Sequence, residues 1–154
     1  MTTTPEEQLA KLGLRLPTPV KPVAAYVPTV RAGNLVFVAG QIPMVEGKLA
    51  RTGQVGKDVT LEEGQHLART CALNCLAAVK AEVGDLSRVK RVVRVGAFVA
   101  SADSFTDQPK VANGASELLV EVFGEKGRHA RAAVGVNVLP LGAPVEVEML
   151  VEVE

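Results

Sequence analysis

This chain of 154 residues has few aromatic side chains and no net charge. Tryptophan is absent, tyrosine occurs once, and aromatic residues make up only 3% of the sequence, which leaves few surfaces on which bases could stack. The 17 basic residues are balanced by 17 acidic ones, so no long-range field draws the protein towards a polyanion or a charged membrane. We therefore expect neither a nucleic acid nor a membrane as a partner.

Motifs for metals and organic cofactors are missing as well. His66 and His129 are the only histidines and have no HxxxH or HExxH spacing, while Cys71 and Cys75 do not form a CxxC pair. The sequence also contains no GxGxxG, P-loop or GxSxG motif. We expect no metal and no cofactor, and we expect both cysteines to be core residues.

Targeting signals are the third absence. The first 14 residues include Glu6, Glu7 and Lys11 among apolar positions, which is unlike a secretory signal. No apolar run approaches the length of a membrane span. Two cysteines four residues apart on a helix have poor geometry for a disulfide, which suits a reducing compartment. The sequence therefore predicts a cytoplasmic protein.

What the chain does contain is a clear succession of helical and extended patterns. A short helix is expected at 5–13, followed by an extended segment at 14–28 that holds four prolines. Gly33 and Asn34 separate two β-rich runs and favour a hairpin. The remaining patterns predict a helix at 61–83, a strand at 89–101, a helix around 111–123, and strands at 131–139 and 145–154. We expect residues 1–22 to be an N-terminal arm and 23–154 to be a single domain.

This order, ββαβαββ, predicts an α+β fold with both helices packed on one face of a sheet. The last two strands are joined by the turn-forming run at 140–144, which is too short for a crossover helix. We therefore expect these two strands to pair antiparallel.

The second face of this sheet is too apolar to be exposed to water. Alternation predicts that Val145 and every second residue after it face the helices, together with Ala132 and Val134 of the preceding strand. Arg131, Ala133 and Gly135 would then share the opposite face with other apolar side chains. Since such a face needs a cover, we expect the protein to self-associate through it.

Charged residues gather on two strands. The basic set is expected to form cross-strand ion pairs with the acidic set, although a phosphate-binding patch is the alternative for the basic residues. The basic residues are Arg88, Lys90, Arg91 and Arg94, and the acidic residues are Glu146, Glu148, Glu152 and Glu154. We set two residues apart: Glu146, and Arg131, whose buried guanidinium would need an anion such as a carboxylate.

Four short motifs stand out in the sequence: AGQIP at 39–43, RAAV at 131–134, LP at 139–140 and VEVE at 145–148. Together they resemble the Rid/YjgF family of reactive intermediate deaminases. AGQIP is similar to the family's SGQIP turn, and RAAV is similar to its RSxV strand. LP at 139–140 and VEVE at 145–148 resemble the family's LP and VEIE ending. The run from Asn113 to Arg131, NGASELLVEVFGEKGRHAR, resembles a longer branch with an extended N-terminal arm.

The resemblance implies a chorismate-mutase-like homotrimer with three sites between subunits. Members of the family hydrolyse 2-imino and enamino acids to 2-keto acids and ammonia, without a cofactor. By position, Arg131 would bind the substrate carboxylate and Glu146 would orient or activate water. Backbone N–H groups of Gly40 and Ala133 would hold the ligand.

Two further residues complete the substrate-binding set that the resemblance implies. Tyr26 would form a wall of the pocket, and Asn113 is assigned to the same set.

A non-catalytic trimeric protein that binds small carboxylates is the alternative. It is favoured by two departures from the family pattern: Ala39 stands where many members have Ser or Thr, and Ala133 where many have Cys. His129, which stands where Pro is common, is a third departure. Both hypotheses predict a small-molecule carboxylate as the ligand.

Overall fold

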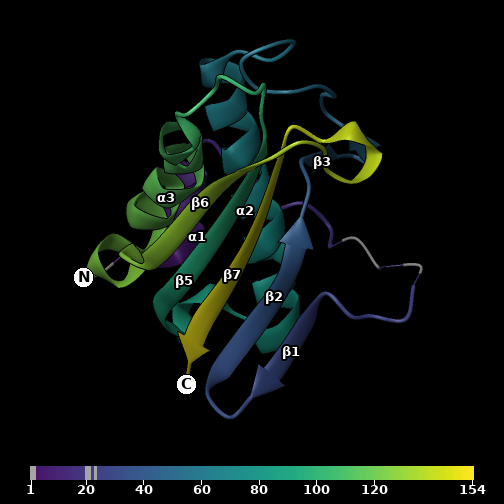
Figure 1. Cartoon of the computed structure of the whole chain (residues 1–154). Helices are drawn as coiled ribbons and strands as arrows, with labels where there is room; N and C mark the ends of the chain where they lie inside the picture. Colours follow the sequence, from purple (N-terminus) through teal and green to yellow (C-terminus); the bar gives the residue numbers. More distant parts are fainter. Residues whose placement is uncertain (1–2, 20–21, 23) are drawn as a thin grey trace.

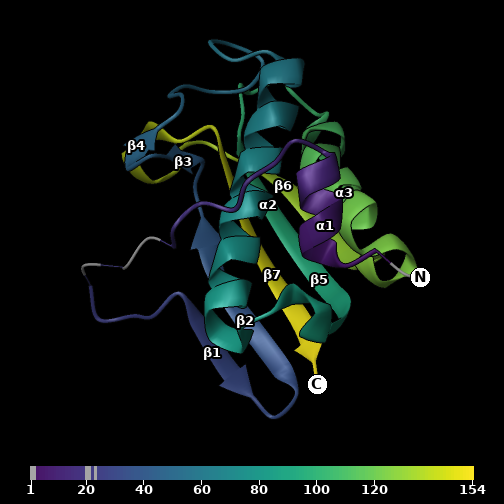
Figure 2. The same cartoon turned by 180° about the vertical axis from the view of Figure 1, so that it is seen from behind.

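The computed structural model describes residues 3–19, 22 and 24–154 as two layers, one of helices and one of sheet (Figures 1 and 2). The helices are α1 (Pro5–Lys11), α2 (Leu61–Val83) and α3 (Gln108–Phe123). The strands are β1 (Thr29–Ala32), β2 (Leu35–Gln41), β3 (Met44–Val45), β4 (Lys48–Leu49), β5 (Val89–Ala100), β6 (Ala130–Val136) and β7 (Val145–Val153). This architecture confirms the predicted α+β fold. The boundary between a 1–22 arm and a 23–154 domain stays a prediction, and residues 1, 2, 20, 21 and 23 lie outside the described residues.

The main sheet has the strand order β1-β2-β7-β5-β6. β1 and β2 form the predicted hairpin, in which Gly33 adopts a φ of 61°, a left-handed conformation that suits glycine. β2 and β5 flank β7 and both pair with it antiparallel. The small β3–β4 hairpin forms a separate sheet.

The predicted pairing of the last two strands is wrong. β6 pairs with β5 in parallel, with Ala97 opposite Ala133, and β7 lies on the other side of β5. β5, α3 and β6 form a β-α-β unit, and the helical connection returns the chain in the same direction. The segment at 137–144, which contains only a 3-10 turn at Pro140–Gly142, then passes the end of β5.

The predicted faces of β6 are also reversed. Ala133 packs against the core, and a side-chain carbon placed on Gly135 would meet Gln108 of α3, so Arg131, Ala133 and Gly135 face the helices. Val134 is 46% exposed on the open side. Because β6 carries small or apolar residues on both faces, alternation alone could not decide between them. In β7 the prediction is confirmed, since residues 145, 147, 149, 151 and 153 are all buried against the helix layer.

Helices α2 and α3 pack closely together on one face of the sheet, the face turned to the viewer in Figure 2. α2 begins with a capping box between Thr60 and Glu63, which satisfies two backbone N–H groups of its first turn. A Cβ on Gly114 of α3 would overlap the backbone carbonyl of Gln65, so only glycine permits this approach. Cys71 and Cys75 are fully buried in this layer, as predicted, and burial raises the pKa of both thiols.

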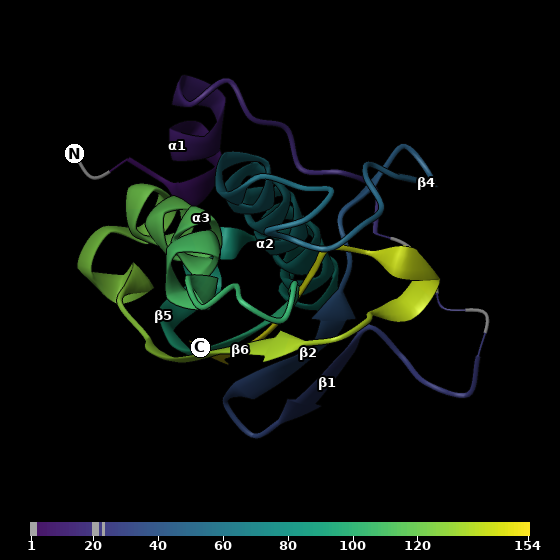
Figure 3. The ribbon, with the colours of Figure 1, turned by 45° about the horizontal axis from the view of Figure 1, so that its top comes forward.

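Helix α1 lies on the outer side of the helix layer (Figure 3). It packs against α3 and the short turn before β5, and its Leu9 joins the core. Glu6 forms an ion pair with Lys80 and accepts a hydrogen bond from the Leu86 N–H, which fixes the helix to the end of α2.

Candidate active site

Arg131 lies on β6 and points towards α3. Its Nη1 donates hydrogen bonds to Asn113 Oδ1 at 2.8 Å and to Ser116 Oγ at 3.1 Å. Asn113 and Ser116 share one face of α3 because they are three residues apart on a helix. The structure therefore brings two predicted site residues, Arg131 and Asn113, into direct contact.

His129 extends this network on the other side of Ser116. Its Nε2 lies 2.8 Å from Ser116 Oγ, and its Nδ1 lies 2.6 Å from the backbone carbonyl oxygen of Gly127. Burial and the positive charge of Arg131 lower the pKa of His129, although the Gly127 carbonyl acts in the opposite sense. We call Asn113, Ser116, His129 and Arg131 the Arg131 cluster. A cavity of about 230 Å³ opens beside it, lined by Ser116, Val120, Arg128, His129 and Arg131.

Glu146 lies on the open face of β7 and is half-buried there. Burial raises the pKa of its carboxyl, and the neighbouring charge of Glu148 raises it further. A Cβ on Gly40 would overlap this carboxylate and would lie 3.0 Å from its Cδ. Glycine at position 40 thus makes room for the carboxylate, so the structure brings Gly40 and Glu146 together as well.

A single chain does not bring Arg131 and Glu146 together. Arg131 is in register with Val95 of β5, whereas Glu146 is opposite Phe98. β6 and β7 are separated by one strand, which puts them roughly 10 Å apart. The two side chains also lie on opposite faces of the sheet, and the cavity beside Arg131 is not lined by Glu146.

Tyr26 and Ala133 are the two remaining predicted site residues. Tyr26 is 58% exposed in the segment before β1. Ala133 is half-buried on the helix side of β6, on the same face as Arg131.

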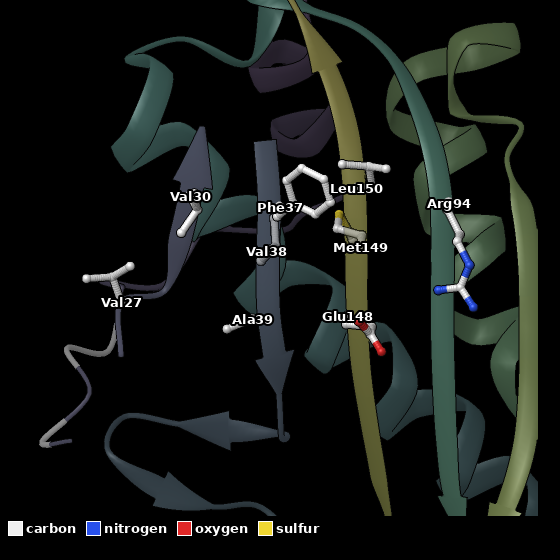
Figure 4. A pocket seen from close by; sticks show the side chains of 9 residues that line it. All are labelled: Val27, Val30, Phe37, Val38, Ala39, Arg94, Glu148, Met149 and Leu150. Atoms are coloured by element: carbon white, nitrogen blue, oxygen red, sulfur yellow. The ribbon is translucent and has the colours of Figure 1, made fainter. Parts of the chain in front are cut away.

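The open sheet face carries a shallow groove of about 380 Å³ (Figure 4). Phe37 and Leu150, which are cross-strand partners, line it with Arg94 and Glu148, whose side chains project over the strands. Phe37 is 48% exposed. This face is apolar with a few charges and, among the described elements, bears no helix.

The predicted cross-strand ion pairs do not form. Arg91 lies opposite Glu152 in the register. Within residues 3–19, 22 and 24–154, however, the ion pairs join other residues and none connects β5 to β7.

The described residues contain no group of three or more His, Cys, Asp or Glu side chains arranged to hold a metal ion. None of their helices combines the length and the apolar character that crossing a membrane requires.

Comparison with known proteins identifies the fold family. A family profile described as "YjgF/chorismate mutase-like, putative endoribonuclease" matches residues 6–153. The chain belongs to this family. The crystal structure of Atu1372 from Agrobacterium tumefaciens, a protein of unknown function, superposes with a TM-score of 0.92 at 49% identity, covering 97% of this chain and 92% of that one.

Two named relatives match most of the chain. Protein TCP17 of Trypanosoma cruzi is 51% identical over 94% of this chain and 91% of its own length. A protein of Dermatophagoides farinae named 2-iminobutanoate/2-iminopropanoate deaminase is 30% identical over 90% of this chain and 93% of its own. Membership of the YjgF family confirms the resemblance inferred from the short motifs.

Sequence reasoning missed Ser116 as a site residue and noted His129 only as a departure from the family pattern. A signal for Ser116 was present, since a polar residue three positions after Asn113 must share its helix face. For His129 no local signal exists, because its contact with Ser116 depends on how β6 packs against α3.

Proposed function

We propose that this YjgF-family protein hydrolyses 2-imino and enamino acids to 2-keto acids and ammonia, without a cofactor, at sites between the subunits of a homotrimer. The proposal rests on the hydrogen bonds of Arg131 and on its positive charge. Its guanidinium is held by the neutral oxygens of Asn113 and Ser116, and none of the ion pairs among the described residues includes it. Its positive charge is therefore available to an anionic ligand.

Arg131 would bind the carboxylate of the imino acid. A guanidinium matches a carboxylate through two parallel N–H···O bonds, which fixes both the position and the orientation of the substrate. Backbone N–H groups of Gly40 and Ala133 would add further donors, Asn113 would support the arginine, and Tyr26 would close one side. Fixing the imine carbon in place supplies much of what an already electrophilic centre needs.

Glu146 would position and activate the attacking water. The water adds to the imine carbon while one of its protons passes to the carboxylate and the imine nitrogen takes up a proton, which gives a carbinolamine. The carboxyl then returns its proton to the amine, the carbon–nitrogen bond breaks, ammonia leaves, and loss of the hydroxyl proton forms the keto group. An enamine enters this sequence after protonation of its carbon to the imine. A carboxyl with a raised pKa is better matched to this proton transfer than an exposed one.

A second copy of the chain completes the site in this proposal. Arg131 and Glu146 of one subunit lie on opposite faces of the sheet, whereas the open faces of adjoining subunits can pack together. The exposed Phe37 and Val134 give that face the apolar character of a subunit interface. Because β6 is the edge strand of the sheet, Arg131 of one subunit would have to reach Glu146 of the next around that edge and not across the packed faces.

A relative's name supports the reaction, and two alanines favour the alternative. The Dermatophagoides farinae relative is named as a deaminase of this type. Against this, Ala39 and Ala133 offer no hydroxyl or thiol to a ligand. They favour the second candidate, a trimeric protein that binds small carboxylates and does not turn them over.

The test measures turnover and binding separately. An amino-acid oxidase generates imino acids of several side-chain sizes, semicarbazide traps them, and suppression of the adduct reports hydrolysis. Calorimetry with 2-ketobutyrate and pyruvate reports binding. We expect Arg131→Ala to abolish binding, with each lost charge-assisted hydrogen bond costing roughly 1.5–3 kcal/mol. Arg131→Lys should restore binding only in part, because an ammonium lacks the planar fork.

Glu146→Gln separates the two candidate functions. It should retain most of the keto-acid binding but lose turnover, because an amide is a far poorer base. Normal keto-acid binding by Arg131→Ala would contradict the proposed carboxylate site. Binding without hydrolysis of any imine by the wild type would instead establish the non-catalytic alternative.

A further inference from the structure

The support of Arg131 is a chain of hydrogen bonds in which each group has a defined role. The Gly127 carbonyl can only accept, so the proton of a neutral His129 must be on Nδ1. Nε2 is then an acceptor, and the Ser116 hydroxyl must donate to it across 2.8 Å. The Ser116 oxygen keeps its lone pairs for Arg131, which donates to it.

This arrangement orients Arg131 without neutralising it. The two hydrogens of Nη1 match two acceptors, Asn113 Oδ1 and Ser116 Oγ. Both contacts use Nη1, so the edge formed by Nε–H and Nη2–H has no hydrogen-bond partner among the described residues. That edge presents two parallel N–H bonds, the geometry that a carboxylate accepts bidentately.

Two observations set this support apart from ordinary surface polarity. Ser116 and His129 line the cavity beside Arg131, so a change at either residue acts where a ligand would lie. Both side chains are partly buried, which makes an unsatisfied hydroxyl or ring nitrogen costly and the arrangement well defined.

We propose that Ser116 and His129 are positioning residues for Arg131. They hold its Nη1 so that its Nε/Nη2 edge receives the carboxylate side-on. This inference rests on the proposed function for the role of Arg131 and adds two residues that act through it. The ligand class that this edge selects is a planar monoanion, such as a 2-keto or 2-imino carboxylate.

The proton positions can be tested on the wild-type protein without any ligand. Nitrogen NMR distinguishes the two neutral tautomers of histidine, and a His66→Gln variant assigns the signals because His66 is the only other histidine. We expect His129 to be neutral near pH 7, with its proton on Nδ1. A proton on Nε2, or a doubly protonated ring at that pH, would overturn the inference.

The positioning role is tested by binding of 2-ketobutyrate. Ser116→Ala should weaken binding roughly tenfold, whereas Ser116→Thr, which keeps the hydroxyl, should restore it to within about twofold. His129→Ala should weaken binding by roughly threefold. Because both residues act through one chain of contacts, the double variant should bind about as weakly as Ser116→Ala alone. Additive losses, or no rescue by threonine, would contradict the proposal.

Matched controls and Arg131→Ala separate this inference from the proposed function. Ser104→Ala and His66→Ala remove an exposed serine and an exposed histidine elsewhere and should bind normally. If Arg131→Ala binds normally, the proposed carboxylate site is wrong. If Arg131→Ala loses binding while Ser116→Ala retains it, only the positioning role is wrong.

Discussion

The Arg131 cluster and the acidic part of the open sheet face, Glu146 with Glu148, differ in how far a single chain completes them. In the cluster, Asn113 and Ser116 of α3 hold the arginine through hydrogen bonds of 2.8 and 3.1 Å, and His129 contacts Ser116 at 2.8 Å. On the open face, two carboxylates stand near one another, and burial and mutual repulsion raise the pKa of Glu146. The first region is complete within one chain. The second is an open, charged and apolar surface that the proposed trimer would cover.

The largest expected effect comes from placing a charge on the open face. Val134→Asp should convert a trimer into monomers, since an unpaired carboxylate buried at an interface costs roughly 3–5 kcal/mol. Light scattering at micromolar concentration measures the mass. Val45→Asp is the matched control, because Val45 is similarly exposed at 49% but lies on the small β3–β4 sheet. A wild-type protein that is itself a stable monomer would break the comparison.

A smaller effect is expected from filling the space beside Glu146. Gly40→Ala should displace the carboxylate, which can move at little cost to the fold, and should lower imine hydrolysis roughly ten- to a hundredfold. The free energy of unfolding, measured by thermal denaturation, should change by less than about 1 kcal/mol. Gly96→Ala is the control, since its Cβ would press on Glu148 instead. Equal losses in both variants would show that Glu146 has no special part in turnover.

The smallest effect concerns pH. If Glu146 must be ionised to accept a proton, kcat/KM falls as the pH drops through its raised pKa. Removing the Glu148 charge removes one cause of that rise, so Glu148→Gln should lower the pKa and move the acid limb of the profile to lower pH. Glu152→Gln, farther along β7, should leave the limb unchanged. A shift to higher pH in Glu148→Gln would contradict the assignment.

Local signals in the sequence were enough for the long helix and the first hairpin. α2 begins and ends at the predicted residues because its apolar spacing, its capping box and Gly84 agree. The turn at Gly33 and Asn34 could be predicted from these two residues alone. The partner of β6 was not predictable in this way, because strand order depends on contacts between distant segments, and neither face of β6 is clearly polar.

In the candidate site, too, local sequence signals identified residues but not their arrangement in space. The motifs identified Arg131 and Glu146 as individual residues, and the helical spacing of Asn113 and Ser116 was present in the sequence. Whether Arg131 faces α3 or the open side depended on the β6 register, so its direction was predicted wrongly. The separation of Arg131 from Glu146 within one chain followed only from the three-dimensional arrangement.

Strand β6 also has a consequence for solubility. It is the outermost strand of the sheet beside β5, and its seven residues, ARAAVGV, include one charge and no proline. Natural proteins usually protect such edges with charges, prolines or a covering segment, because unpaired backbone groups recruit strands from other molecules. An unassembled chain would therefore expose a template for aggregation. We expect variants that dissociate to aggregate at concentrations well above the micromolar range used for light scattering, so assembly would serve to keep the protein soluble as well as to build a site.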